Sequence, residues 1–261
     1  KLTELDAQKK LEYFRKKHKY YLYPSFNTIA ASGPNSAIIH YKATKKTNRL
    51  IKKKEIFLLD SGGQYKYGTT DITRTLCLKK QTQKIKDIFT RVLKGHIAVV
   101  TANLKKIKSA NLLDIRARKY LIKKKLDYPH GTGHGVGYFL NVHEGPIAIS
   151  KGYKILLETG QVISNEPGFY KKNKFGIRIE NMIYVSECKH RKLFKNLTMV
   201  PIEKSMIDYN ILSKKEKNYL IDYNLEIYTK LERYLEYNEK FWLLSQFWDC
   251  LKIVLIQYSY F

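Results

Sequence analysis

Two pairs of carboxylates, each on a predicted β-hairpin, constrain this chain more than any other feature. Asp60 and Asp71 are 11 positions apart, since 71 − 60 = 11, on two predicted strands joined by a glycine-bearing turn. Glu166 and Glu180 are 14 positions apart, since 180 − 166 = 14, on a second predicted hairpin. Successive side chains alternate between the faces of a strand, so Arg178 points the same way as Glu180. The chain must therefore fold so that it accommodates four acidic side chains.

The hairpins are predicted from short runs of apolar and β-branched residues bounded by glycine, proline and asparagine. Helices are predicted from apolar side chains at helical spacing, and a Ser-x-x-Glu capping box opens the last of them at Ser213. Strands are expected over residues 55–61, 69–78, 161–166 and 176–185, with turns over 62–68 and 167–175. A mixed helical and antiparallel chain, α+β in class, follows from this order of elements.

Four carboxylates gathered in one core would be prohibitively costly unless a cation neutralises them. Either hairpin alone would more simply be a solvated sheet edge. Two such hairpins with a histidine cluster between them favour a metal site instead. A set of four carboxylates and one imidazole is rich in hard oxygen donors, which suits Mn²⁺, Co²⁺ or a similar divalent ion.

Three of the seven histidines lie in a glycine-rich run between the two hairpins. These are His130, His134 and His143. Glycine on both sides of His134 lets the backbone come close to whatever the imidazole contacts. One histidine on the metal with others within reach of a proton is the arrangement that metal-assisted hydrolysis needs. His40 follows Ile38 and Ile39, and by itself it predicts only a core histidine.

Five segments, in this order and spacing, closely resemble the eukaryotic cytosolic Xaa-Pro aminopeptidases (aminopeptidase P) of peptidase family M24. The resemblance extends over about residues 3–235. The segments are Asp60-Ser61-Gly62-Gly63-Gln64-Tyr65, Gly68-Thr69-Thr70-Asp71-Ile72-Thr73-Arg74-Thr75, His130 through Pro146, Asn165-Glu166-Pro167-Gly168-Phe169-Tyr170, and Phe175-Gly176-Ile177-Arg178-Ile179-Glu180-Asn181.

This resemblance implies a catalytic domain with the pita-bread (creatinase/aminopeptidase) fold, a curved antiparallel sheet flanked by helices. It also implies two divalent metal ions, Mn²⁺ first, with Co²⁺ or Zn²⁺ as alternatives. Asp60 would bind one ion, Asp71 and Glu180 would bridge the two, and His134 with Glu166 would complete the other. The pair would activate a water molecule and polarise the scissile carbonyl.

The resemblance also implies catalytic roles for four further side chains. His40, His130 and His143 would position the substrate, stabilise the tetrahedral intermediate and move protons, and Arg178 would support the site from beside Glu180. A simple salt bridge between Arg178 and Glu180 is an equally good interpretation. The implied reaction releases the N-terminal residue from peptides with proline in the second position. Prolidase and methionine aminopeptidase, which share the fold, remain alternatives.

Residues 1–238 are expected to form the catalytic domain and residues 239–261 an apolar C-terminal extension. A packed helix is expected for that extension, because Asp249 and Lys252 near its middle would be costly in a bilayer. The chain begins without Met, so we expect it to be part of a longer protein. The family carries two further domains ahead of this one, and the full-length form is expected to be a homodimer.

The chain is strongly basic, with 49 Lys and Arg against 23 Asp and Glu, a net charge of +26. Such a charge raises the alternative of a non-catalytic binding module for nucleic acid. Only nine of the 49 are Arg, however, and the Lys runs are short and scattered, which argues against a specific nucleic-acid partner. Three widely spaced cysteines suit a reducing compartment, so a cytoplasmic protein without a membrane partner is expected.

Overall fold

The computed structural model describes residues 1–188 and 191–258, with side chains described as far as residue 247. Its order of elements is a helix, six strands, two helices, seven strands and two helices. The helices are α1 Glu4–Lys16, α2 Gln83–Val100, α3 Ala110–Ile122, α4 Lys214–Leu231 and α5 Tyr237–Tyr258. The strands are β1 Tyr21–Pro24, β2 Ile29–Ser32, β3 Ile56–Ser61, β4 Gly63–Tyr65, β5 Gly68–Thr69, β6 Ile72–Cys77, β7 Gly133–His134, β8 Ala148–Ile149, β9 Val162–Asn165, β10 Gly168–Lys171, β11 Phe175–Arg178, β12 Asn181–Cys188 and β13 Arg191–Asn196.

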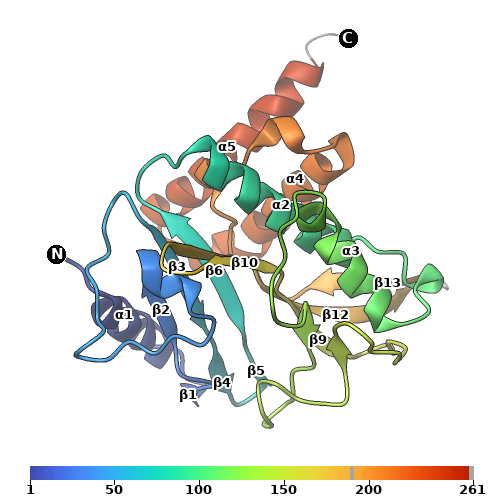
Figure 1. Cartoon of the computed structure of the whole chain (residues 1–261), viewed down its shortest axis with the longest axis horizontal. Helices are drawn as coiled ribbons and strands as arrows, with labels where there is room; N and C mark the ends of the chain where they lie inside the picture. Colours follow the sequence, from blue (N-terminus) through green and yellow to red (C-terminus); the bar gives the residue numbers. More distant parts are fainter. Residues whose placement is uncertain (189–190, 259–261) are drawn as a thin grey trace.

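All the described strand ladders are antiparallel, and two three-stranded sheets dominate. One has the order β2-β3-β6 and the other β13-β12-β9. Figure 1 shows the first on the left of the molecule and the second on the right, with α2 and α3 over the right half and α4 and α5 above. Helices and antiparallel sheets in these proportions agree with the predicted α+β class.

Each predicted hairpin is present, and three of the four carboxylates lie at breaks between strands, while Asp60 lies within β3. In the first hairpin β3 pairs with β6, and Asp60 lies opposite Thr73. Asp71 falls in the break between β5 and β6, rather than inside a continuous strand as predicted. Its backbone N–H donates to the Met182 sulfur at 3.1 Å, so that amide bonds a side chain of the second hairpin and not a ladder partner.

The second hairpin has the same plan. Strand β9 pairs with β12, strand β10 pairs with β11, and the two ladders are separated by breaks that contain Glu166 and Glu180. The predicted turn over residues 167–175 was therefore wrong in extent, because most of it is strand. Pairing of Lys171 with Phe175 leaves only a three-residue tip. A break frees a backbone amide or carbonyl from the ladder and lets the adjacent carboxylate turn toward the other hairpin.

The largest hydrophobic cluster lies between the sheets and the helices α2 and α4. The capping box at Ser213 opens α4 as predicted, since Ser213 and Glu216 bond each other's backbone N–H. Helix α5 packs on this cluster through Leu243 and Phe247, which are 2% and 3% exposed. Among the residues that the structure describes, no helix has the length and apolar character needed to cross a membrane. A packed helix was the expectation for this part of the chain, and its described portion is one.

Candidate metal centre

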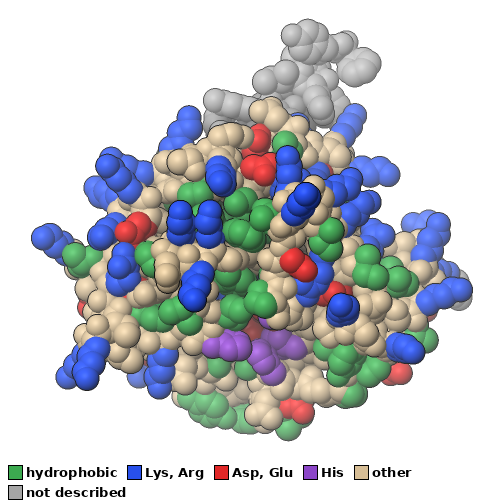
Figure 2. Space-filling model, viewed as in Figure 1, with side chains coloured by type: hydrophobic (Ala, Val, Ile, Leu, Met, Phe, Trp, Pro, Cys, Tyr) green, Lys and Arg blue, Asp and Glu red, His purple; other side chains and the backbone are tan. Residues whose placement is uncertain are grey.

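One cavity contains all nine residues that the sequence singled out. Its volume is about 680 Å³, and it opens on the face where Figure 2 shows histidines grouped together, with hydrophobic side chains above and below them. The nine residues come from both hairpins, from the glycine-rich run and from the segment after β2. They are His40, Asp60, Asp71, His130, His134, His143, Glu166, Arg178 and Glu180.

Asp60 is held by a buried arginine. One Asp60 oxygen, Oδ2, accepts a hydrogen bond from Arg178 Nη2 at 2.6 Å, in an ion pair whose side chains are 10% and 2% exposed. Arg178 therefore pairs with Asp60, and the predicted alternative of a salt bridge to Glu180 is wrong. Arg178 and Glu180 line the same cavity, as the alternation of side chains predicted. The carboxylate that pairs with Arg178, however, is Asp60 of the other hairpin.

Glu180 is tied to the first hairpin through Thr73. The Thr73 hydroxyl donates to Glu180 Oε2 at 2.7 Å and accepts from Arg178 Nε at 3.1 Å. The Glu180 backbone N–H donates to the Thr73 carbonyl at 3.1 Å. These bonds bring the edge of one sheet to the edge of the other, so that Asp71 and Glu180 face a common space.

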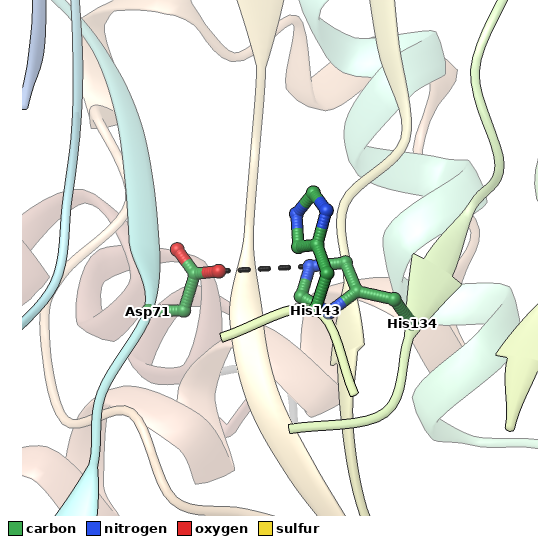
Figure 3. A group of neighbouring side chains, drawn as sticks. All are labelled: Asp71, His134 and His143. Carbon is green, nitrogen blue, oxygen red and sulfur yellow. Dashed lines mark ion pairs between the residues drawn. The ribbon is translucent and has the colours of Figure 1, made fainter. Parts of the chain in front are cut away.

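His134 faces the same space from β7. Its Nε2 lies 3.3 Å from Glu166 Oε1 and 3.6 Å from Asp71 Oδ2, the second of which is drawn in Figure 3. Its Nδ1 lies 2.9 Å from the Gly135 carbonyl oxygen. A carbonyl only accepts, so Nδ1 carries the proton and Nε2 presents its lone pair to the carboxylates. Such a second bond is what orients a metal-binding imidazole.

Three overlapping groups of side chains in this space could each hold a divalent ion. The ligand atoms within a group all lie within 4.8 Å of one another. The groups are Asp60 with Asp71 and Glu180, His134 with Glu166 and Glu180, and Asp71 with His134 and His143. Two groups share Glu180 and two share Asp71, which is the overlap that a two-ion centre requires.

Buried atoms without partners support a cation in this space. Among the described residues, Asp60 Oδ1 and His134 Nε2 are buried and make no hydrogen bond. An orphaned acceptor in a protein interior is costly unless water or an ion satisfies it. Both atoms belong to expected metal ligands, and a carboxylate oxygen and an imidazole nitrogen are ordinary ligands for Mn²⁺ or Co²⁺.

Burial, and after it repulsion between neighbouring acids, raises the pKa values of three carboxyl groups in this space. Burial, followed by repulsion from other acids such as Asp60, raises the pKa of Glu166 to about 7, although Arg178 lowers it in part. Burial and the neighbouring carboxylates raise the pKa values of Asp71 and Glu180 well above their usual range. One Arg178 does not neutralise four acids, and two divalent ions would.

A second set of hydrogen bonds leads from Arg178 to His130. Arg178 Nη1 donates to the Tyr170 hydroxyl at 2.6 Å, and that hydroxyl lies 2.9 Å from His130 Nε2. Since His130 Nδ1 lies 2.7 Å from the Gly131 carbonyl, Nδ1 carries the proton and Tyr170 donates to Nε2. Burial lowers the pKa of His130 to about 4, so this imidazole is neutral at pH 7.

The other two histidines lie nearer the opening of the cavity. His143 and His40 are exposed, and the centroids of the His143 and His134 rings are 3.9 Å apart. Figure 3 shows His143 beside His134 and facing the same region as Asp71. His40 was predicted from its apolar neighbours to be a core histidine, but its side chain is exposed at the wall of the cavity.

Family models place the chain among known proteins. The model for metallopeptidase family M24 matches residues 1–187, and the model for the C-terminal region of peptidase M24 matches residues 193–247. The chain belongs to metallopeptidase family M24. The predicted membership is therefore confirmed, and the five metal-ligand candidates lie within the first matched region.

Several M24 relatives are similar over nearly the whole chain. A probable Xaa-Pro aminopeptidase P of Ajellomyces capsulatus is 45% identical over 249 residues, which are 91% of this chain and 40% of that protein. One of Aspergillus fumigatus is 46% identical over 91% of this chain and 38% of its own length. The chain thus spans about 40% of the length of the curated relatives it matches.

Solved M24 structures share the fold. The X-prolyl aminopeptidase of Caenorhabditis elegans, described as a cytosolic enzyme with a di-nuclear active site, matches with a TM-score of 0.88 at 38% identity. That match covers 94% of this chain and 42% of the other. The prolidase of Pyrococcus furiosus matches with a TM-score of 0.67 at 33% identity, over 75% of this chain and 55% of the other. The predicted α+β pita-bread fold is confirmed.

Sequence reasoning missed three residues that organise this M24 site. Thr73 and Tyr170 connect the arginine to Glu180 and to His130, and Arg74 bonds the backbone on both sides of the junction between the hairpins. All three lie inside the segments that carried the family resemblance. Side chains alternate along a strand, so the sequence places Thr73 on the same face as Asp71, but no sequence signal indicates the partners of Tyr170 or Arg74.

Proposed function

We propose that this chain is the catalytic domain of a dinuclear-metal aminopeptidase that hydrolyses the bond between an N-terminal residue and a following proline. The assembly of the five expected ligands in one cavity carries the proposal. The names of the relatives, Xaa-Pro aminopeptidase P and X-prolyl aminopeptidase, support the substrate class.

In this proposal Asp60 would hold one ion, His134 and Glu166 would hold a second, and Asp71 and Glu180 would be shared by both. The two residue groups that share Glu180 support this division. Two bound divalent ions supply a water molecule of lowered pKa and polarise the scissile carbonyl. We propose Mn²⁺ as the ion, with Co²⁺ and Zn²⁺ as alternatives, because four of the five ligands are carboxylates.

The remaining residues act on the substrate directly or through a ligand. Arg178 holds Asp60 in the orientation that leaves its Oδ1 facing the cavity. His130 is neutral and both of its ring nitrogens are hydrogen-bonded, so it is suited to hold Tyr170 in place and to position the peptide through its ring at the cavity wall. His143 and His40, near the opening, are suited to contact the substrate and to move protons to and from the leaving group.

The wider biology is proposed on the family resemblance. Residues 1–238 would be the catalytic domain and 239–261 an extension to it. The location would be cytoplasmic, the partners would be peptides with proline in the second position, and the full-length protein would be a homodimer. Specific nucleic-acid binding and membrane attachment form no part of the proposal.

The test is a peptidase assay on chelator-treated protein with metal restored. We expect release of the first residue from an Xaa-Pro-Xaa tripeptide, stimulated by Mn²⁺ and abolished by chelator. Asp71→Ala and Glu180→Ala should each lower kcat/KM by at least about 10³-fold, because each removes a bridging ligand and leaves the other acids unneutralised. Unchanged turnover in both variants would sink the proposal.

The choice of peptide separates the alternatives that share this fold. Cleavage of the dipeptide Xaa-Pro but not of the tripeptide would indicate a prolidase, and cleavage of a Met-Ala-Xaa peptide would indicate a methionine aminopeptidase. Stoichiometric metal binding without cleavage of any of the three would indicate a non-catalytic module.

A further inference from the structure

Arg74 is a buried cation whose role the metal chemistry does not explain. It lies on β6, is 5% exposed, and takes part in none of the ion pairs among the described residues. The acceptors that surround its guanidinium are all uncharged. They are the carbonyls of Thr73, Glu180, Val200 and Pro201, the amide oxygen of Asn181 and the hydroxyl of Tyr223.

The position of Arg74 follows from strand alternation. Thr73 and Thr75 flank it and turn toward the second hairpin on the cavity side, where Thr73 bonds Glu180 and Thr75 exchanges hydrogen bonds with the Arg178 backbone. The Arg74 side chain must leave β6 on the opposite face. It therefore lies behind the metal centre, toward α4, and cannot itself be a ligand or reach a substrate.

One end of the guanidinium spans the junction between the two hairpins. Nη1 donates to the Thr73 carbonyl at 2.9 Å and to the Glu180 carbonyl at 2.6 Å. Thr73 belongs to the hairpin that bears Asp60 and Asp71, and Glu180 belongs to the other. A single nitrogen thus bridges the two backbones within two residues of Asp71 on one side and at Glu180 itself on the other, and it reinforces the direct bond from the Glu180 N–H to the Thr73 carbonyl.

The other end anchors this junction to the C-terminal part of the chain. Nη2 donates to Asn181 Oδ1 and to the Val200 carbonyl, each at 2.7 Å, and Nε donates to the Pro201 carbonyl at 3.0 Å. Nη2 also lies 3.2 Å from the hydroxyl of Tyr223, a buried residue of α4. These acceptors surround a planar guanidinium, whose N–H groups point in fixed directions. A lysine ammonium cannot make the same set of hydrogen bonds.

We propose that Arg74 is a positioning residue, which sets the spacing of the two carboxylate-bearing hairpins and thereby the affinity of the centre for divalent ions. The proposal rests on the metal site of the proposed function but not on its substrate. A buried positive charge beside a cation site opposes cation binding electrostatically. Arg74 therefore favours the bound ions through geometry alone.

The test compares substitutions that separate charge from geometry. Arg74→Lys keeps the positive charge but removes the planar guanidinium. If Arg74 acts by positioning the hairpins, this variant should lose Mn²⁺ affinity; if Arg74 acts only through its charge, the affinity should not change. We expect at least a tenfold weaker Kd for Mn²⁺, measured by calorimetry on the whole protein after chelator treatment. The Co²⁺ absorption spectrum of the variant should also change, because the coordination geometry would be altered.

Arg91→Lys is the matched control. Arg91 is a partly buried arginine on α2 that pairs with Asp87 and bonds the Tyr120 carbonyl, and it has no described bond to either hairpin. The Arg91→Lys variant should have a lower thermal midpoint than wild type, but its Kd for Mn²⁺ should change by less than twofold. An equal loss of Mn²⁺ affinity in both variants would mean a general stability effect and would overturn the proposal.

Tyr223→Phe covers the case in which Arg74→Lys does not fold. It deletes a hydroxyl that bonds both Arg74 and Asn181 while Arg74 itself remains. We expect a two- to fivefold weaker Mn²⁺ Kd. Wild-type affinity in Tyr223→Phe, or in a folded Arg74→Lys, would overturn the proposal. If the wild type binds Mn²⁺ but cleaves no peptide, the proposed function fails while the role of Arg74 is still decided by these affinities.

Discussion

At the scale of single residues, the protonation of the acidic side chains depends on what neutralises them. Glu166 has a pKa of about 7 in the folded chain against 4.5 for an ordinary glutamate. Between those values the folded state binds more protons than the unfolded state, so the free energy of unfolding falls as the pH rises. The stabilising protonation is fully present below about pH 4.5 and is lost by about pH 7.

Glu166→Gln should therefore stabilise the metal-free protein at neutral pH. A difference of 2.5 between the two pKa values corresponds to at most about 3 kcal/mol. We expect a higher thermal midpoint than wild type at pH 7.5 after chelator treatment, and no gain at pH 4.5. The buried histidines shift stability in the opposite direction, but they are the same in both proteins and cancel in the comparison.

Added metal supplies the control for this prediction. With excess Mn²⁺ the wild type should have the higher thermal midpoint of the two proteins. Metal binding stabilises the folded wild type, and the variant has lost part of that binding free energy. A metal-free variant no more stable than wild type at pH 7.5 would contradict the raised pKa of Glu166.

The sequence identified residues that the structure brings into one cavity, and their roles as metal ligands stay a prediction. Asp60, Glu166 and His134 stood out because paired carboxylates and flanking glycines suggested a metal site, and the family resemblance implied a role for each. The partner of Arg178 was not predictable, because alternation orders side chains within one hairpin and says nothing of which hairpin lies opposite. Arg74 is a similar case, since its acceptors are mostly backbone carbonyls that any sequence would supply.

At the scale of elements, the glycines around His134 allow strands to pack closely. This is in addition to the predicted approach of backbone to the imidazole, which the Gly135 carbonyl makes at 2.9 Å from Nδ1. A Cβ on Gly133 would lie 2.0 Å from the Ser164 carbonyl oxygen, on the strand that precedes Glu166. The glycine thus lets β7 and β9 approach each other, which sets the distance between His134 and Glu166.

Gly133→Ala should force these two strands apart. Overpacking against backbone costs about 1–3 kcal/mol, and the displaced His134 should weaken Mn²⁺ binding as well. Gly68→Ala is the matched control, since a Cβ there meets no atom within 4 Å. Thermal unfolding and Mn²⁺ titration of both variants provide the measurement, and equal behaviour of the two would refute the packing argument.

The two hairpins were only partly predicted from the sequence. Runs of β-branched and apolar residues located both hairpins, because those patterns are local. The breaks at Asp71, Glu166 and Glu180 were not predicted, since they arise from bonds between the hairpins, such as that from the Glu180 N–H to the Thr73 carbonyl. Contacts between distant segments decide these irregular positions, and three of the four candidate carboxylates lie at them.

At the scale of the whole molecule, helix α5 extends the hydrophobic core beyond the segment that carried the family resemblance. Two adjacent leucines on it differ sharply, because Leu243 is 2% exposed and Leu244 is 37% exposed. The Lys204 ammonium also donates to the Ser245 carbonyl at 2.6 Å. The start of the predicted extension therefore packs as part of the fold.

Leu243→Ala should consequently destabilise the protein, whereas Leu244→Ala should have little effect. Removing a buried leucine side chain costs about 2–5 kcal/mol, and removing a partly exposed one costs much less. Urea unfolding of the two variants measures the difference. If their midpoints agree, α5 contributes nothing to the stability of the fold.

The distribution of the proposed ligands along the chain has a consequence for folding. Asp60 and Glu180 are 120 positions apart, since 180 − 60 = 120, and the structure brings them together where the two hairpins meet. Asp60 and Asp71 come from the first half of the chain and His134, Glu166 and Glu180 from the second, so neither half alone holds all five proposed ligands. A bound pair of ions would therefore report that the two hairpins have docked.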